Sequence, residues 1–145
     1  MKIADLNSPA RGDMIQLRFP LREFVGFKRV MGLPGETIEV RESRIIVNGS
    51  PILVKPLKPA DFFWVPRSTK LGSFVGLEQD HFITYTRGLS KIRNCPAVRL
   101  AARQYFLLGD NRDDSWDSRE FGPISADRII GKAILTLPTG PRASH

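Results

Sequence analysis

The sequence predicts a mainly β domain, and three observations support that prediction. The 145 residues include 11 prolines and 12 glycines at short intervals, which leaves little room for a long helix. Short runs that alternate apolar and polar side chains fill the gaps, as is typical of strands closed by turns. With 41% hydrophobic and 26% charged residues, the composition is that of an ordinary globular protein. We therefore expect a single domain over residues 1–145.

Strands are expected where an apolar run ends at turn-forming residues. The first run stops at Pro20, and the second stops at residues 32–35, which read Gly-Leu-Pro-Gly. Two later runs flank residues 42–43 as a hairpin, and the Asn-Gly pair at 48–49 offers the next turn. In chain order, the expected strands cover residues 14–19, 24–31, 37–41, 44–47, 81–86, 105–108 and 129–137.

Two further segments complete the expected organisation. Ser125 is suited to cap a helical turn over residues 125–128, which is the one helical turn we expect. The segment 51–76 combines four prolines with mixed polarity, and this pattern predicts a loop-rich course. We treat residues 51–95 as a loop-rich insertion in the β-domain.

Several classes of protein are excluded by simple counts. Cys95 is the only cysteine, so there is no disulfide framework. Only His81 and His145 could join it, which is too few for a four-ligand structural zinc site. The longest apolar run is four residues, whereas a membrane-spanning helix needs about 20. We expect no metal, no cofactor and no membrane-spanning segment within these residues.

The charge is strongly basic, with 22 Lys and Arg against 15 Asp and Glu and a net charge of +7. Such a balance suits nucleic acid or an anionic membrane surface, and charge alone does not choose between them. Residues 81–109 hold five basic side chains and no acid, whereas residues 110–127 hold six acids and two arginines. A basic nucleic-acid-binding β-barrel stays open as a remote alternative, although no strand carries a stacked-aromatic motif.

The most unusual window covers residues 109–122, where acids are dense. A calcium-binding loop starting at Asp110 would need a ligand at its third position, a glycine at its sixth and a glutamate at its twelfth. The sequence has Arg112, Ser115 and Phe121 at those places, so this interpretation fails. The remaining interpretation is a polar loop after an apolar strand, in which side chains hydrogen-bond to the loop's own backbone and to one another.

A second window surrounds Lys28. Strand alternation puts this lysine on the face opposite Phe27 and Arg29, among largely apolar neighbours. Apolar surroundings disfavour the charged form of a lysine and lower its pKa from about 10.4. A neutral lysine can act as a general base, so Lys28 is a candidate catalytic residue.

Together the two windows resemble those of bacterial type I signal peptidases, which are membrane-bound serine endopeptidases. The likeness lies in three motifs: residues 11–13, which read Arg-Gly-Asp before a strand; residues 28–38, similar to the family's lysine box; and residues 109–123, similar to its glycine-aspartate-asparagine-arginine box. The resemblance covers nearly the whole chain. It implies a signal-peptidase-like fold, related to that of repressor-cleaving peptidases, in which a folded β-sheet barrel carries an insertion of variable length.

The family's chemistry uses a Ser-Lys dyad, in which a serine attacks the peptide carbonyl and a neutral lysine removes its proton. The resemblance makes Lys28 the catalytic lysine and Ser115 the residue whose hydroxyl orients it. Site-supporting residues implied by the resemblance are Gly109, Arg29, Asp110, Asp117 and Arg119, with Arg29 paired to Asp110 and Asp117 paired to Arg119. Substrate-binding residues implied by it are Val25, Gly26 and Phe27, with Phe27 a candidate pocket wall.

One part of the family pattern is missing. The nucleophile of the family sits in a serine-methionine-any-proline box several dozen residues before the lysine, and no such box occurs here. We therefore expect a catalytic domain that lacks its nucleophile and membrane anchor through truncation and is inactive as written. A natural serine-less relative that binds peptides or assists assembly is the alternative.

The resemblance also implies partners and a location. The partners are the signal peptides of secretory preproteins, with small residues before the cut, and a membrane surface; nucleic acid is not expected. The location is the inner, cytoplasmic membrane, with the catalytic domain on its outer, periplasmic face.

Overall fold

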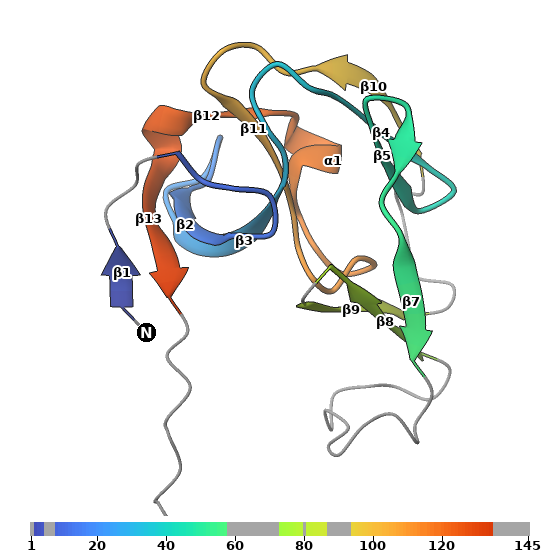
Figure 1. Cartoon of the computed structure of the whole chain (residues 1–145). Coiled ribbons are helices and arrows are strands. Elements are labelled where there is room, and N and C mark those ends of the chain that lie inside the picture. The colour runs from blue at the N-terminus through green and yellow to red at the C-terminus, as the bar shows by residue number, and fades with distance from the viewer. Residues whose placement is uncertain (1, 5–7, 58–72, 80, 87–93, 135–145) are drawn as a thin grey trace, which may run out of the picture.

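The structure is a computed structural model that describes residues 2–4, 8–57, 73–79, 81–86 and 94–134. Strands dominate the described residues and form three sheets, with one short α-helix and one 3₁₀ turn among them (Figure 1). The expected mainly β class is thus confirmed. The last three residues of the expected strand 129–137 lie outside the described part.

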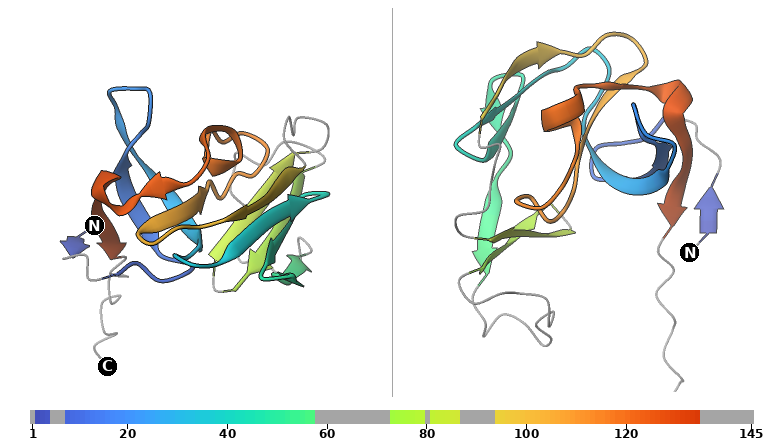
Figure 2. Two further views of the ribbon diagram at one scale, coloured as in Figure 1. Left: turned by 90° about the horizontal axis from the view of Figure 1, so that it is seen from above. Right: turned by 180° about the vertical axis from the view of Figure 1, so that it is seen from behind.

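The largest sheet has six strands in the order β1-β13-β2-β3-β11-β12, all antiparallel. Its strands are β1 (Lys2–Ala4), β2 (Met14–Arg18), β3 (Val25–Gly32), β11 (Gln104–Leu108), β12 (Ile124–Ser125) and β13 (Ile129–Ile134). The register of the β2–β3 hairpin places Ile15 opposite Lys28. Figure 2 shows this hairpin, in blue, extending away from the rest of the molecule when it is seen from above.

The second sheet has the order β10-β4-β5-β6 and packs against the first through a shared core. Its strands are β4 (Thr37–Arg41), β5 (Arg44–Val47), β6 (Ser50–Pro51) and β10 (Cys95–Arg99). The β4–β5 hairpin has the bounds that alternation predicts, and its two turn residues adopt positive φ angles, 49° at Glu42 and 66° at Ser43.

The third sheet differs from the loop-rich course expected for the insertion. It consists of β7 (Val54–Leu57), β8 (Ser73–Glu78) and β9 (His81–Thr86), and only β9 was expected. The prolines predict a loop, but Pro56 lies on β7. Within the described residues, β7 pairs only with β8. An edge strand tolerates proline because one of its sides needs no backbone donors.

Two short helical elements join the strands at the C-terminal end of the fold. Ser125 accepts a hydrogen bond from the Asp127 backbone and caps the 3₁₀ turn η2 (Ala126–Arg128), as the sequence predicts. The α-helix α1 (Ser118–Phe121) was not expected, because it occupies four residues inside the polar loop. Asp117 caps it by accepting from the backbone N–H of Arg119.

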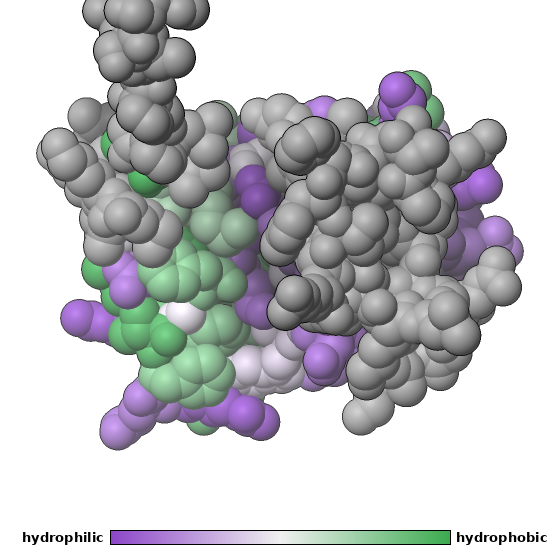
Figure 3. All heavy atoms as spheres, turned by 90° about the horizontal axis from the view of Figure 1, so that it is seen from below, coloured by the Kyte–Doolittle hydropathy of each residue, from purple (hydrophilic) through white to green (hydrophobic). Residues whose placement is uncertain are grey.

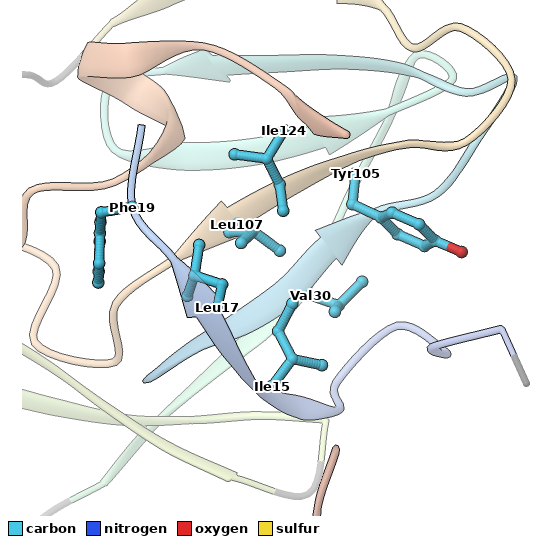
Figure 4. Close-up of a cluster of buried hydrophobic side chains, with 7 residues drawn as sticks. All are labelled: Ile15, Leu17, Phe19, Val30, Tyr105, Leu107 and Ile124. Carbon is cyan, nitrogen blue, oxygen red and sulfur yellow. The ribbon is translucent and has the colours of Figure 1, made fainter. Parts of the chain in front are cut away.

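The end of β3, from Val30 to Gly32, and most of β11 are buried on both faces, so they lie between two cores. Val30 and Leu107 point into the first core, whereas Met31 and Phe106 point into the second. The first core consists of Ile15, Leu17, Phe19, Val30, Tyr105, Leu107 and Ile124 (Figure 4). The second consists of Met31, Ile38, Ile45, Val47, Leu100, Phe106 and Leu108. A run of apolar residues such as 105–108 is what a strand buried on both faces requires.

The Arg-Gly-Asp motif at residues 11–13 attaches the start of β2 to β3. The Gly12 N–H donates to the Val30 carbonyl at 2.8 Å, and the Val30 N–H donates to the Asp13 carbonyl at 2.9 Å. Gly12 has a φ of 91°, a conformation that favours glycine. Arg11 donates to Glu36 and to the Met31 carbonyl, which fixes the turn that follows β3. These bonds hold the end of β3 to the segment that precedes β2.

Truncation of a core ring should destabilise the fold strongly. Phe106→Ala removes a side chain that is 1% exposed, and we expect the free energy of unfolding to fall by about 3–5 kcal/mol. Denaturant titration followed by circular dichroism measures the change. Leu53→Ala is the control, because that side chain is 82% exposed and should cost less than about 0.5 kcal/mol. Equal stability of the two variants would contradict the second core.

Candidate active site

Lys28 lies in the middle of β3, on the face that also carries Val30 into the first core. Its Nζ donates a hydrogen bond to Ser115 Oγ at 2.8 Å, across 87 positions of sequence. The same Nζ lies 5.7 Å from the centre of the Phe19 ring. The amine therefore has one hydroxyl partner and one aromatic face next to it, and its residue is half-buried.

Burial lowers the pKa of the Lys28 amine below its ordinary value. The charges around the amine oppose one another, since Asp117, Asp110 and Asp114 raise this pKa and Arg119 lowers it. Loss of hydration is the largest effect, so the neutral amine is favoured relative to a lysine in water. The expectation of a lowered pKa, reached from the apolar neighbours in sequence, agrees with this environment.

Gly109 allows the polar loop to approach Lys28 closely. A Cβ at this position would lie 2.2 Å from Ser115 Oγ and 3.4 Å from Lys28 Nζ. No side chain fits there without moving Ser115. The position follows from strand pairing, because β11 pairs with β3 through Leu108 and Arg29, and Gly109 comes next to Lys28 in that antiparallel register.

The Arg29–Asp110 pair that the resemblance implies is present. Arg29 Nε and Nη2 donate to the two carboxylate oxygens of Asp110 at 2.7 and 2.6 Å. A third donor, Nη1, bonds the Gly12 carbonyl at 2.6 Å. A bidentate arginine–carboxylate pair is directional, so it sets the orientation of the loop as well as its distance from β3.

The Asp117–Arg119 pair is also present and is buried. Arg119 Nε and Nη2 donate to the Asp117 carboxylate at 2.9 and 2.8 Å, and the Asp117 side chain has no exposed surface. The same carboxylate accepts from the Gly109 N–H at 3.1 Å. It therefore connects the helix α1 to the residue beneath the Lys28–Ser115 pair.

Val25, Gly26 and Phe27 form the first half of β3. They pair with β2 on one side, while β11 pairs with β3 only from Arg29 onward. Within the described residues, no strand covers the other edge of 25–28. The side chains of Val25 and Phe27 are 47% and 40% exposed, so this edge is open to solvent.

The ring beside the amine is Phe19 rather than Phe27, which lies on the opposite face of β3. A Cβ at Gly26 would meet the Phe19 ring at 2.6 Å, so that ring fills the space above Gly26. Phe19 stacks on Trp116 with ring centres 5.5 Å apart. The cluster of Phe19, Phe24, Trp116 and Phe121 thus forms an apolar wall next to Lys28.

The sequence alone does not predict this aromatic wall, because its members come from two segments far apart along the chain, the β2–β3 hairpin and the polar loop with α1. Nor does it single out Glu78 or Ser118. Ser118 is buried and accepts from the Leu107 N–H at 2.9 Å, which ties α1 to β11. Glu78 forms an ion pair with Arg112, and both side chains are almost fully buried. Arg112 and Ser118 lie in the polar window 109–122, whereas Glu78 lies in neither window of the sequence.

Across residues 2–4, 8–57, 73–79, 81–86 and 94–134, no three His, Cys, Asp or Glu side chains come together in a way that could hold a metal ion. In that part of the chain no helix has the length and apolar character needed to cross a bilayer.

Comparison with known proteins gives consistent matches along the chain. The sequence model of the family described as "Signal peptidase, peptidase S26" matches residues 2–137. A signal peptidase I of Pseudomonas aeruginosa is 30% identical over 155 residues, covering 97% of this chain and 53% of that protein. The Bacillus subtilis protein named signal peptidase I V is 35% identical over 121 residues, covering 83% of this chain and 62% of that protein.

A solved structure shares the fold. The crystal structure of a signal peptidase I from Enterococcus faecalis superposes with a TM-score of 0.51 at 27% identity, covering 90% of this chain and all of that one. The expected signal-peptidase-like β fold is confirmed by this likeness. The chain spans about half the length of the Pseudomonas relative, at 53% of that protein.

The environment of Lys28 predicts an unusual titration. Because burial lowers its pKa, we expect the Lys28 signal to titrate at lower pH in the folded chain than in the chain unfolded by denaturant. NMR of protein labelled with ¹³C and ¹⁵N at lysine follows the transition, and Lys28→Arg assigns the signal. A midpoint equal to or above that of the unfolded chain would show that the amine is solvated.

Proposed function

Because the chain belongs to the S26 family of signal peptidases, we propose that it provides the catalytic β-domain of a signal peptidase I, with Lys28 as general base. The observation that carries this proposal is the half-buried Lys28 amine, 2.8 Å from Ser115 Oγ and next to an open strand edge. A base needs a neutral form near working pH, and burial favours that form here. An oriented base next to a peptide-binding edge is suited to peptide-bond cleavage.

The chemistry begins with the hydroxyl of the family's serine nucleophile. Its oxygen attacks the carbonyl carbon before the cut, while its proton moves to the neutral Nζ of Lys28. The carbon–nitrogen bond then breaks as the Lys28 ammonium gives that proton to the departing amine. The neutral Lys28 then removes a proton from a water molecule, whose oxygen attacks the acyl ester carbon. The bond from that carbon to the serine oxygen breaks as the Lys28 ammonium gives its proton to this oxygen, which releases the carboxyl product and restores both the serine and the neutral lysine.

Ser115 is proposed to orient the lysine rather than to attack the substrate. Its Oγ packs against the backbone of Gly109, where even one added carbon would approach to 2.2 Å. A hydroxyl held in this way can keep the lone pair of the neutral Lys28 amine directed toward the nucleophile. This is the role of a third group in an activated nucleophile–base pair.

We propose that the substrate binds as an added strand along residues 25–27. The backbone groups of Val25 and Phe27 on the open edge of β3 can pair with an extended peptide. Small residues before the cut are expected because the Phe19 ring already fills the space above Gly26. Members of the family act on the signal peptides of preproteins, and this chain is proposed to do the same.

A membrane surface is the second proposed partner, with the domain on the outer face of the inner membrane. Leu21 is 93% exposed at the tip of the β2–β3 hairpin, and Phe24 is 44% exposed. Arg18, Arg22 and Arg128 line one hollow together with Phe24. Figure 3 shows a hydrophobic area on this side of the molecule, bordered by hydrophilic residues. Exposed apolar side chains can enter the interface of a bilayer, while arginines next to them are attracted to its anionic headgroups.

Cleavage tests the proposed chemistry directly. A fusion that adds the family's serine box and anchor ahead of residue 1 should cleave a preprotein after an Ala-X-Ala sequence, as measured by gel mobility. Lys28→Ala should abolish cleavage, because no other group replaces the base. Ser115→Ala should reduce it by about 10²-fold or more without abolishing it, since it removes orientation and not the nucleophile.

The matched control for the cleavage assay is Lys55→Ala, at an exposed lysine on β7. It should cleave like the parent fusion. Full activity of Lys28→Ala would exclude the lysine base, and complete loss in Ser115→Ala would contradict a role for Ser115 limited to orientation.

Vesicle binding tests the membrane surface. The chain should sediment with vesicles of phosphatidylglycerol more than with vesicles of phosphatidylcholine, and added salt should weaken this binding. Leu21→Asp should reduce the bound fraction several-fold, because it introduces a charge at the hairpin tip. Leu53→Asp, at a side chain 82% exposed elsewhere, is the control and should bind as the parent does. Equal loss in both variants would contradict a specific membrane face.

A further inference from the structure

A buried pair of opposite charges joins the insertion to the polar loop. Glu78 ends β8 and is 1% exposed, while Arg112 in the loop is 2% exposed. Arg112 Nη1 donates to Glu78 Oε1 at 3.0 Å, and Nη2 donates to the other carboxylate oxygen. A carboxylate and a guanidinium so removed from water are stable only as a pair, because either one alone would be an uncompensated buried charge.

Arg112 also reaches the residue beneath the Lys28–Ser115 pair. Its Nε donates to the Gly109 carbonyl at 2.9 Å, while its two other donors bond Glu78. The Gly109 N–H donates to Asp117 at 3.1 Å. Both backbone polar groups of Gly109 are thus bonded by side chains of buried ion pairs, Asp117–Arg119 on one side and Glu78–Arg112 on the other.

The backbone of the insertion contacts the same loop. Thr84 of β9 donates its N–H to the Asp110 carbonyl at 2.9 Å and accepts from the Arg112 N–H at 2.9 Å. These bonds form a parallel bridge between Thr84 and Asn111. The β8–β9 hairpin therefore holds residues 110–112 by backbone and side chain together.

We propose that Glu78 is a positioning residue for catalysis, acting through Arg112 and Gly109 on the Lys28–Ser115 hydrogen bond. The inference rests on the proposed peptidase function and gives the insertion a part in it. Gly109 packs so closely against Ser115 and Lys28 that a displacement of a few tenths of an ångström alters their 2.8 Å contact. Hydrogen bonds weaken steeply with misalignment, so a loosened Gly109 leaves the amine poorly oriented.

The test compares Glu78→Gln with Glu39→Gln. Glu78→Gln removes the charge that holds Arg112, whereas Glu39→Gln removes a carboxylate paired with Arg41 on a surface strand. In the cleaving fusion, Glu78→Gln should lower kcat by about ten- to a hundredfold and leave KM within about twofold, because the peptide-binding edge of β3 is untouched. Glu39→Gln should leave both constants unchanged.

A double-mutant cycle separates positioning from general weakening. In a Ser115→Ala background the hydrogen bond to be oriented is already gone, so Glu78→Gln should cost less than about twofold in kcat. The same loss in both backgrounds, a rise in KM alone, or an unchanged kcat would overturn the inference.

A readout on the 145-residue chain itself does not depend on cleavage. If Gly109 loosens, water reaches the Lys28 amine, and its NMR titration midpoint should rise in Glu78→Gln but not in Glu39→Gln. Removal of a negative charge acting directly would lower that midpoint, so the sign identifies the cause. A midpoint that stays or falls overturns the inference. If the midpoint rises while the parent fusion fails to cleave, the proposed function fails and the positioning of Lys28 stands.

Circular dichroism shows whether Glu78→Gln folds. If it does not, a second variant, Arg112→Lys, tests the same inference. Arg112→Lys keeps a positive charge for Glu78 but lacks the separate Nε donor to the Gly109 carbonyl. It should fold, and it should show the same fall in kcat and the same rise of the Lys28 midpoint. A folded Arg112→Lys protein with the parent's kcat and midpoint would overturn the inference.

Discussion

The antiparallel pairing of β3 with β11 is the constraint on which the other features depend. The last three residues of β3 and most of β11 are buried on both faces, and they separate the two cores. Since Leu108 pairs with Arg29, the first residue after β11 comes next to Lys28. Lys28 and the polar loop thus come together through the pairing of these two strands. The two cores that pack against β3 and β11 therefore stabilise the backbone around Lys28.

The polar loop then solves an electrostatic problem. It carries many acids close to Lys28, and exposed carboxylates there would favour the protonated form of the amine. Arginines bind the two carboxylates that face the loop's interior, Asp110 and Asp117, through bidentate pairs. Asp117 raises the pKa of Lys28 and Arg119 lowers it, which leaves burial as the largest effect. The ion pairs therefore hold the loop in place and limit its field at the amine.

The insertion has a closer relation to the site than its prolines indicate. Its β8–β9 hairpin bonds residues 110–112 through Thr84 and Glu78, so three segments meet around Gly109. The aromatic wall has a similar origin, since Phe19 follows β2 whereas Trp116 lies in the polar loop, and the two rings stack only when these segments pack together. Segments from β2, the polar loop and the β8–β9 hairpin thus come together around the half-buried Lys28.

Local pattern in the sequence predicted the chemistry-bearing motifs and part of the strands, but not β1, β6, β7, β8, β10 or β12. Alternation predicted β4, β5 and β9 with the bounds observed, because a strand with one buried face repeats every two residues. Proline misled the interpretation of β7, since a strand's tolerance for proline depends on whether its outer edge has a partner. Whether a strand lies at the edge depends on how the whole sheet is assembled, so a proline by itself does not distinguish an edge strand from a loop.

The sequence alone also identified Lys28 and Ser115 as candidates, because each stands in a long motif whose residues are close together along the chain. Only the tertiary structure decided which ring lies against the amine, which carboxylate holds Arg112, and where β3 has an open edge. Glu78 and Arg112 are 34 positions apart, and neither residue by itself predicts the other. Such contacts arise from the packing of whole sheets, and burial then makes each charge depend on a partner that no local pattern specifies.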